Sequence, residues 1–246
     1  NLASGLSLLG KKSLILDLDP QGNSTSGLGI DKSLLNKSIY NVLLGELSLY
    51  ESFKTIDLNN NKKITISPSV GDLSGADIEL YSIEDREWIL KKALSSSSLD
   101  NYDYILIDCP PSLSLLTINA FTAADSLLIP VQCEFFAMEG LAQLNKTIEL
   151  IISRLNPSLE IEGLLLTMYD SRNNICKTVA SEVKEFFKEK VLKTLIPKNV
   201  KLAESPSFGK CIFDYDSECL GAISYLNLSK EIISKNGGTF IEKIIR

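Results

Sequence analysis

The feature that most constrains the fold of this chain is a series of short apolar runs separated by longer segments with helical periodicity. Each run is five to eight residues long and nearly continuous in apolar character. Such runs are typical of strands in a parallel sheet whose two faces are both covered by helices. The predicted strands are residues 13–17, 63–67, 104–108, 126–131 and 161–168.

The segments between these runs carry apolar residues at helical spacing. Alternating strands and helices predict an α/β fold with a doubly wound, mostly parallel sheet flanked by helices. The predicted helices are residues 72–80, 84–95, 114–124, 138–155, 177–188 and 221–234, and Asn236-Gly237-Gly238 is expected to end the last one. We find no internal repeat and no linker, and we interpret the serine run at 95–98 as a solvated loop. Residues 1–246 are therefore expected to form a single domain.

Composition narrows the possible chemistry. The chain contains no histidine, which excludes Ser-His-Asp and Cys-His catalysis and most zinc sites. Its five cysteines have no CxxC spacing, so we expect no disulfide framework and a reducing, cytoplasmic compartment. Catalysis would have to use carboxylates, lysines, backbone amides and a bound magnesium ion.

Charge and hydropathy limit the possible partners. The net charge of −6 means that any contact with nucleic acid must come from a local basic patch or from assembly. The most apolar stretches are far too short to span a bilayer, so no stable membrane insertion is expected. The first ten residues, NLASGLSLLG, lack the basic start and the cleavage site of a signal peptide.

Acidic residues follow two of the predicted strands. Asp17 and Asp19 occur where the first strand ends, and Asp108 ends the third. In open α/β sheets ligands bind at the carboxyl ends of the strands, and a carboxylate held there can fix magnesium or its water shell. An aspartate at such a position can equally cap the next turn, and from the residues alone both interpretations remain open.

One segment of eight residues nearly matches the sequence motif of a phosphate-binding loop. Gly5-Leu6-Ser7-Leu8-Leu9-Gly10-Lys11-Lys12 satisfies GxxxxGK and fails at the final Ser/Thr. A phosphate loop follows a strand and opens a helix, whereas this octet is expected to end a helix and lead into a strand. We therefore interpret Gly10 as a helix C-terminal residue, with the two lysines beside the negative end of the helix dipole.

Five segments carry a resemblance that spans nearly the whole chain. They are DLDPQGNSTSGLG at 17–29, YDYILIDCPPSLSLLTINA at 102–120, IPVQCEFFAMEGL at 129–141, LLLTMYDSR at 164–172 and IPKNVKLAESPSFGK at 196–210. In sequence, order and spacing they resemble the ParA/Soj family of DNA-partitioning ATPases, a deviant branch of the P-loop NTPases.

The resemblance implies roles for the three aspartates. Asp19 would orient the attacking water, and Asp17 would be its supporting carboxylate. Asp108 would correspond to the Walker B aspartate and hold Mg²⁺ through its water molecules.

The resemblance also implies residues that contact the nucleotide. Gly22 and Asn23 would belong to a mobile turn that meets the partner subunit across the nucleotide. Met168, Pro197 and Asn199 would frame and hydrogen-bond adenine. A core residue at the end of a strand is the alternative interpretation of Met168.

At the level of function, the resemblance implies an ATPase that uses ATP/ADP and Mg²⁺ to partition a chromosome or plasmid. It would form a homodimer on ATP binding, bind DNA without sequence preference, and have its hydrolysis stimulated by a ParB-like partner. It would be cytoplasmic and associated with the nucleoid. Candidate DNA-binding side chains are Lys184, Lys188, Lys190, Lys193, Lys198 and Lys201, for which ordinary solvated surface is the alternative.

Two alternative functions remain open. One is a non-catalytic ParA-like remnant that acts as an interaction protein. The other is a MinD-like membrane-associated regulator, since relatives of that type end in a basic amphipathic helix. The terminal segment GGTFIEKIIR has a possible apolar side made of Phe240, Ile241, Ile244 and Ile245. Its excess positive charge is small, so we interpret it as a segment that packs on the domain.

The phosphate-binding element of the family has no counterpart in these 246 residues. In the family an opening strand leads into a lysine- and glycine-rich deviant Walker A loop, whose backbone amides hold phosphate. Asn1-Leu2-Ala3 resembles the helix after that loop, so the expected fold is P-loop NTPase-like and N-terminally truncated. Truncation of a normal ATPase and genuine loss in a degenerate paralogue would both explain this. We expect this polypeptide alone to hydrolyse no ATP and its sheet to lack a central strand, which would leave an exposed edge.

Overall fold

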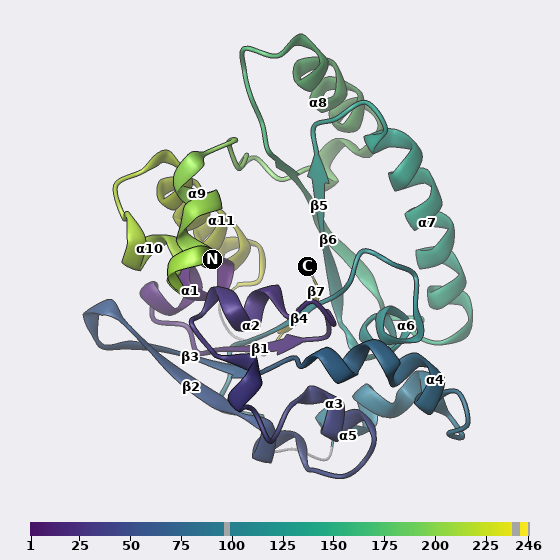
Figure 1. Cartoon of the computed structure of the whole chain (residues 1–246). Coiled ribbons are helices and arrows are strands. Elements are labelled where there is room, and N and C mark those ends of the chain that lie inside the picture. The colour runs from purple at the N-terminus through teal and green to yellow at the C-terminus, as the bar shows by residue number, and fades with distance from the viewer. Residues whose placement is uncertain (96–98, 238–241, 246) are drawn as a thin grey trace.

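The computed structural model describes residues 1–95, 99–237 and 242–245. Its centre is a seven-stranded sheet in the order β2-β3-β1-β4-β7-β5-β6 (Figure 1). The strands are β1 Ser13–Asp17, β2 Lys54–Leu58, β3 Lys62–Ser67, β4 Tyr104–Asp108, β5 Ser126–Gln132, β6 Glu160–Thr167 and β7 Glu242–Ile245. Every neighbouring pair is parallel except β2 and β3. The predicted doubly wound, mostly parallel sheet is confirmed.

Helices cover both faces of this sheet. The α-helices are α1 Leu2–Leu8, α2 Asn23–Gly27, α3 Ile39–Leu43, α4 Ala76–Leu80, α5 Ile89–Ser95, α6 Leu115–Ala123, α7 Ala137–Arg154, α8 Asn174–Phe187, α9 Val200–Glu204, α10 Ile212–Tyr215 and α11 Leu220–Lys235. Short 3-10 turns are η1 Lys32–Leu34, η2 Leu49–Ser52, η3 Asn59–Asn61, η4 Gly71–Gly75, η5 Arg86–Trp88, η6 Lys188–Lys190 and η7 Ser205–Phe208.

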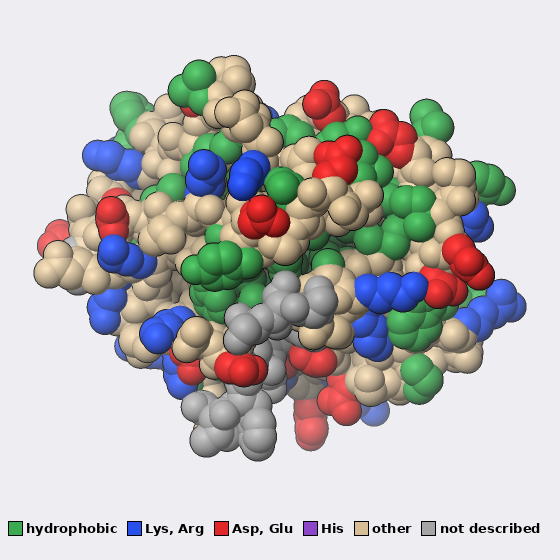
Figure 2. All heavy atoms as spheres, turned by 90° about the horizontal axis from the view of Figure 1, so that it is seen from below, with side chains coloured by type: hydrophobic (Ala, Val, Ile, Leu, Met, Phe, Trp, Pro, Cys, Tyr) green, Lys and Arg blue, Asp and Glu red, His purple; other side chains and the backbone are tan. Residues whose placement is uncertain are grey.

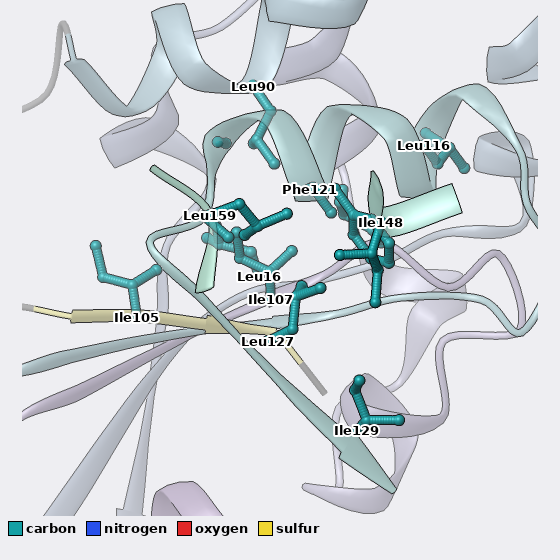
Figure 3. Close-up of a cluster of buried hydrophobic side chains, with 14 of the residues drawn as sticks. Leu16, Leu90, Ile105, Ile107, Leu116, Phe121, Leu127, Ile129, Ile148 and Leu159 are labelled. Atoms are coloured by element: carbon teal, nitrogen blue, oxygen red, sulfur yellow. The ribbon is translucent and has the colours of Figure 1, made fainter. Parts of the chain in front are cut away.

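Two hydrophobic cores lie on opposite faces of the sheet. Leu14 and Leu16 of β1 pack into one core with α3 to α8, and Ile15 between them packs into the other with α1, α10 and α11. Figure 3 shows part of the first core, where Leu16 and Ile107 meet side chains from the covering helices. Because successive strand residues point to opposite faces, a strand between two helical layers has to be apolar at every position.

The predicted elements agree closely with the observed ones. β1 and β4 have the predicted ends, and the other three predicted strands differ by one residue at one or both ends. The predicted helix at 84–95 begins later, with η5 followed by α5. The serine run falls partly on residues 96–98, which lie outside the described residues.

The sequence did not predict β2. This strand pairs antiparallel with β3 at one edge of the sheet, and Lys54, Thr55 and Asp57 are exposed. An edge strand with one solvated face alternates apolar and polar residues. It therefore lacks the continuous apolar run by which the five predicted strands were found.

The expected loss of a central strand is wrong for the described residues. β7 lies between β4 and β5, paired in parallel with Tyr104–Ile107 of β4 and with Ser126 and Leu127 of β5. Residues 242–245 are therefore extended and lie inside the sheet, and the amphipathic-helix alternative does not hold for them. Phe240 and Ile241 lie outside the described residues.

The octet at 5–12 is a helix end, as predicted. Gly10 has φ +84, and the Lys11 N–H donates to the Leu6 carbonyl across the end of α1. Lys11 and Lys12 then lead into β1. A left-handed residue with this bond is a common way for a helix to stop, so the octet is not a phosphate loop.

No helix within the described residues is both long enough and apolar enough to cross a membrane.

Candidate functional site

A large cleft opens at the carboxyl ends of the strands. Its volume is about 1220 Å³, and Asp19, Asn23, Ser24 and Asp108 line one side of it. Other lining residues include Met168, Pro197 and Asn199. We call Asp19, Ser24 and Asp108, together with the buried Asp17 that supports them, the carboxylate wall, and Met168, Pro197 and Asn199 the backbone wall. The cleft exceeds the roughly 300–1,000 Å³ typical of small-ligand pockets.

The two predicted carboxylate turns meet at one edge of the sheet. β1 and β4 are parallel neighbours, and Asp17 is the register partner of Asp108. The Leu18 N–H donates to the Asp108 carbonyl at 2.8 Å, which extends the pairing past the strand ends. Asp19 and Asp108 therefore face the same cleft, as the hypothesis of a shared magnesium–phosphate site requires.

Asp17 lies beneath the cleft and does not line it. It is fully buried, and its Oδ2 accepts hydrogen bonds from the N–H and the hydroxyl of Thr25 at 2.8 and 2.7 Å. Its Oδ1 accepts from the Asp19 N–H at 3.3 Å. Desolvation raises the pKa of Asp17 from 3.8 to about 6, against the lowering effect of the bonds from Thr25 and together with repulsion from Asp108. Asp17 therefore bonds to residues that follow it in the chain, namely Thr25 of α2 and the backbone of Asp19.

Asp19 is partly exposed, and its backbone is held on both sides. Its carbonyl accepts from the Gly22 N–H at 2.8 Å and from the Ser69 hydroxyl at 2.6 Å. Its carboxylate accepts from the Gln21 N–H through Oδ1 at 2.9 Å. An aspartate bonded to the backbone two residues on is a common turn former. Here the same turn places the carboxylate at the cleft.

Asp108 accepts a hydrogen bond from the hydroxyl of Ser24. This carboxylate therefore already binds an O–H donor at the cleft, which is what a ligand of metal-bound water must do. Among the described residues there is no group of three acidic or thiol side chains that could hold a metal ion directly. The residues thus fit a magnesium ion held through water. Burial raises the pKa of neighbouring Cys109 well above 9.0, so this thiol stays neutral.

Gly22 ends the turn that follows Asp19, and Asn23 is the first residue of α2. Gly22 has φ +59, is buried, and is the N-terminal cap position of α2, while Asn23 is exposed and lines the cleft. The Lys32 ammonium donates to the Gln21 carbonyl, and its stem lies against Gly22, where an added Cβ would come 2.9 Å from Lys32 Cδ. The turn is therefore held by the Lys32 ammonium and by the hydroxyl of buried Ser69.

The backbone wall follows β6. Met168 lies just past the strand with φ +52 and is 45% exposed, so its interpretation as a core residue is wrong. The Tyr169 N–H donates to the Ile196 carbonyl at 3.1 Å, and the Lys198 N–H donates to the Tyr169 carbonyl at 3.0 Å. These bonds bring Pro197 beside the end of β6.

Asn199 caps α9. Its side-chain oxygen accepts from the Leu202 N–H at 3.3 Å. This use of the oxygen leaves the NH₂ group as the donor that Asn199 can present to a ligand.

Sequence reasoning missed Ser24, Thr25, Ser69 and Lys32. Thr25 binds Asp17 eight residues away, Ser69 binds Asp19 across 50 residues, and Ser24 binds Asp108 across 84. A serine, threonine or lysine is an ordinary residue for a polar turn, and no local spacing marks such partners.

The candidate DNA-binding lysines are mostly at the surface. Five of the six are exposed, and the sixth, Lys201, is half-buried and paired with Glu204 at 3.1 Å. On the face that Figure 2 shows, basic and acidic side chains are interspersed rather than gathered by sign.

Comparisons with known proteins agree with this fold and site. A family model described as an AAA domain, AAA_31, matches residues 1–161. The sporulation initiation inhibitor protein Soj of Bacillus subtilis is 49% identical over 232 residues, covering 94% of this chain and 90% of that protein. The chromosome partitioning protein ParA of Myxococcus xanthus is 46% identical over 236 residues, covering 96% and 82%.

Among solved structures, one from Mycobacterium smegmatis is described as cobyrinic acid a,c-diamide synthase with bound ADP and magnesium. It is 32% identical and superposes with a TM-score of 0.80 over 98% of this chain and 90% of its own. The two partitioning relatives match at high identity over nearly the whole chain, and the P-loop NTPase-like fold agrees with them. The chain belongs to the ParA/Soj family of chromosome-partitioning ATPases.

Proposed function

We propose that this protein, together with a phosphate-binding loop of the family's kind, partitions DNA by binding and hydrolysing ATP in the cleft, with Mg²⁺ as cofactor. The 246 residues alone are expected to hydrolyse no ATP, so wild type below means the protein that carries such a loop. The observation that carries the proposal is the parallel register of β1 and β4, which brings Asp19 and Asp108 to one cleft. Support also comes from the relatives named ParA and Soj. The M. smegmatis structure, with its ADP and magnesium, supports the choice of cofactors.

In the proposed reaction each carboxylate has one task. Asp108 accepts hydrogen bonds from the water shell of the metal, in the way that it accepts the Ser24 hydroxyl. Asp19 orients the attacking water with its second carboxylate oxygen, because Oδ1 is engaged by the Gln21 N–H. When bound, Mg²⁺ supplies positive charge that stabilises the phosphoryl group in the transition state. Phosphoryl transfer depends mainly on such positioning and charge, so neither carboxylate needs an unusual reactivity.

The backbone wall would receive the base of the nucleotide. Met168 and Pro197 offer apolar surface to a planar ring, and the Asn199 NH₂ group offers a donor to a ring nitrogen. Asn23 is exposed at the cleft and Gly22 precedes it, so we propose that a second subunit meets the phosphates there.

The catalytic part is tested by replacing Asp108. In the protein expressed from its own gene, Asp108→Asn should lower kcat for ATP hydrolysis by about 100-fold or more. Asp57→Asn is the matched control, since Asp57 is exposed on edge strand β2, away from the cleft lining, and forms an ion pair with Lys63 at 3.3 Å. Equal magnesium-dependent turnover in Asp108→Asn and wild type would refute the assigned role. If titration shows that the wild type binds nucleotide but no turnover is detected, the result would instead favour a non-catalytic interaction protein.

Assembly and DNA binding are tested separately. We propose an ATP-dependent homodimer that binds DNA without sequence preference, associates with the nucleoid, and responds to a ParB-like partner. Sedimentation with and without ATP should show the dimer, and DNA affinity should fall steeply as salt rises. A flat salt dependence would reject phosphate binding by the surface lysines. Sedimentation with liposomes in place of DNA would favour the MinD-like alternative.

A further inference from the structure

We infer that Ser69 and Thr25 are positioning residues for Asp19, acting through a closed ring of hydrogen bonds with Asp17. The inference rests on the proposed ATP hydrolysis, in which Asp19 orients water. The ring joins three segments that are separate in sequence: the end of β1, helix α2 and the loop after β3. Neither residue reaches the cleft lining.

The first half of the ring holds α2 to the end of β1. Thr25 is fully buried and donates to Asp17 Oδ2 through both its N–H and its hydroxyl. The same hydroxyl oxygen accepts from the Ser69 N–H at 2.9 Å. Thr25 therefore uses its hydroxyl once as donor and once as acceptor, and links Asp17 with the loop after β3.

The second half of the ring returns to Asp19. Ser69 is fully buried, and its hydroxyl donates to the Asp19 carbonyl at 2.6 Å. The Asp19 N–H closes the ring by donating to Asp17 Oδ1 at 3.3 Å. Both backbone polar groups of Asp19 are thus bound to side chains that water does not reach.

This arrangement fixes the carboxylate of Asp19 indirectly. Within the described residues, the Asp19 carboxylate accepts one hydrogen bond, from the Gln21 N–H in the same exposed turn. Ser69 also supports that turn sterically, since an added Cβ on Gly22 would lie 3.4 Å from Ser69 Cβ. Without the ring, Asp19 would keep its local turn but lose its bonds to Asp17 and to the loop after β3. Hydrogen bonds in a buried network are stronger than exposed ones, so the loss should be felt at the cleft.

The first test removes the Ser69 hydroxyl. Ser69→Ala should lower kcat for ATP hydrolysis about tenfold while KM for ATP changes less than about twofold, because a misplaced group slows the chemical step more than binding. Ser52→Ala is the matched control. Ser52 is also fully buried and donates to a backbone carbonyl, that of Leu49 at 2.6 Å, but it bonds no residue of the site. The control should leave both constants near the wild-type values.

A second readout follows the turn itself. In Ser69→Ala, amide hydrogen exchange in residues 18–24 should become about tenfold faster, as expected for the loss of one buried hydrogen bond. In Ser52→Ala this segment should keep its wild-type exchange. Two variants of Thr25 test the ring if Ser69→Ala folds poorly. Thr25→Val loses the hydroxyl and should show both the lower kcat and the faster exchange in residues 18–24. Thr25→Ser keeps the hydroxyl and should have a kcat near that of wild type.

The outcomes separate the inference from the proposed function. If wild type hydrolyses ATP but Ser69→Ala keeps full kcat and unchanged exchange in 18–24, the positioning role is refuted. Equal losses in Thr25→Ser and Thr25→Val would also refute it, because the hydroxyl would then not matter. If wild type does not hydrolyse ATP, the proposed function fails. In that case the exchange measurements still decide whether the ring holds the turn.

Discussion

The two walls of the cleft are built in different ways. The carboxylate wall is held by side chains: Thr25 and Ser69 bind Asp17 and the backbone of Asp19, and Ser24 binds Asp108. The backbone wall is held mainly by main-chain bonds, in which Tyr169 pairs with the segment after residue 195. One wall therefore depends on residue identity, whereas the other depends on the path of the chain.

This difference predicts where substitutions are tolerated. A side-chain network fails when one member is replaced, because its buried partners lose their bonds. A wall made by main-chain bonds keeps its shape when a side chain changes, and loses only the contacts that side chain made. Substitutions on the carboxylate wall should therefore have large effects, and those on the backbone wall small ones.

The largest expected effect compares Asp19 with Pro197. Asp19→Asn should lower kcat by about 100-fold or more, roughly 3 kcal/mol in the barrier, because a neutral amide orients the attacking water poorly. Pro197→Ala should weaken ATP binding less than about fivefold, since the main-chain pairing beside it remains. Steady-state kinetics and nucleotide titration measure both. A larger loss of transition-state stabilisation in Pro197→Ala than in Asp19→Asn would break the comparison.

The next prediction concerns a place where segments flanking the two walls touch. Gly29, after α2, and Gly209, after η7, both have positive φ, and a Cβ on Gly209 would lie 2.6 Å from Gly29 Cα. Gly209→Ala should lower the free energy of unfolding by about 2–4 kcal/mol, because left-handed backbone strain adds to a clash with main chain that cannot move aside.

Gly45→Ala separates the two causes. Gly45 has φ +75 with no neighbouring atom within 4 Å of an added Cβ. It therefore carries the backbone strain without the clash and should lose only about 1 kcal/mol. Denaturant unfolding of both variants measures the difference. Equal losses would mean that the contact between the two segments adds nothing to stability.

The carboxylate wall was also the wall that the sequence predicted best. β1 and β4 are buried along nearly their whole length, so their apolar runs marked both ends, and Asp17 and Asp108 followed from the parallel arrangement. The backbone wall gave a weaker signal. Met168 departs from a core role because its positive φ turns the chain outward, and a single methionine in a sequence does not reveal its backbone angle.

What the sequence could not supply was the support beneath the site. Ser69 and Thr25 are separated by 44 residues and meet through one N–H and one hydroxyl. The C-terminal segment posed a similar problem, since four residues of β7 find their partners more than 100 positions away. Local sequence patterns indicate which residues are buried and which form helices or strands. A polar contact between residues far apart in the sequence does not change the local pattern around either of them.

A smaller effect is expected for the cap of α9 on the backbone wall. Asn199→Ala should lower the free energy of unfolding by about 1 kcal/mol, because the Leu202 N–H loses its acceptor. Asn199→Asp keeps that acceptor and loses the NH₂ donor, so its stability should stay within about 0.5 kcal/mol of wild type. If the NH₂ group contacts adenine, Asn199→Asp should also prefer ATP over GTP less strongly. Unchanged selectivity would restrict Asn199 to the role of a cap.

The smallest expected effect comes from a carboxylate that supports the chain just before the backbone wall. Glu231 of α11 accepts from the N–H groups of Lys193 and Thr194, at 2.7 and 2.9 Å, just before that wall begins. Desolvation alone would raise the pKa of Glu231. Hydrogen bonds from Thr194 and Lys193 and the charge of Lys235 outweigh it and hold this pKa below its ordinary 4.5.

The sign of the pH dependence follows from that lowered pKa. A carboxylate with a lower pKa in the folded state adds stability above the unfolded value of 4.5 and loses it as pH falls through the folded value. Wild type should therefore be more stable than Glu231→Gln at pH 7, by less than the Asn199→Ala effect, and the gap should close below pH 4.5. Denaturant unfolding of both proteins across this range measures it. A gap that stays constant with pH would mean that the geometry of the side-chain acceptor, and not its charge, holds the segment at 193–194.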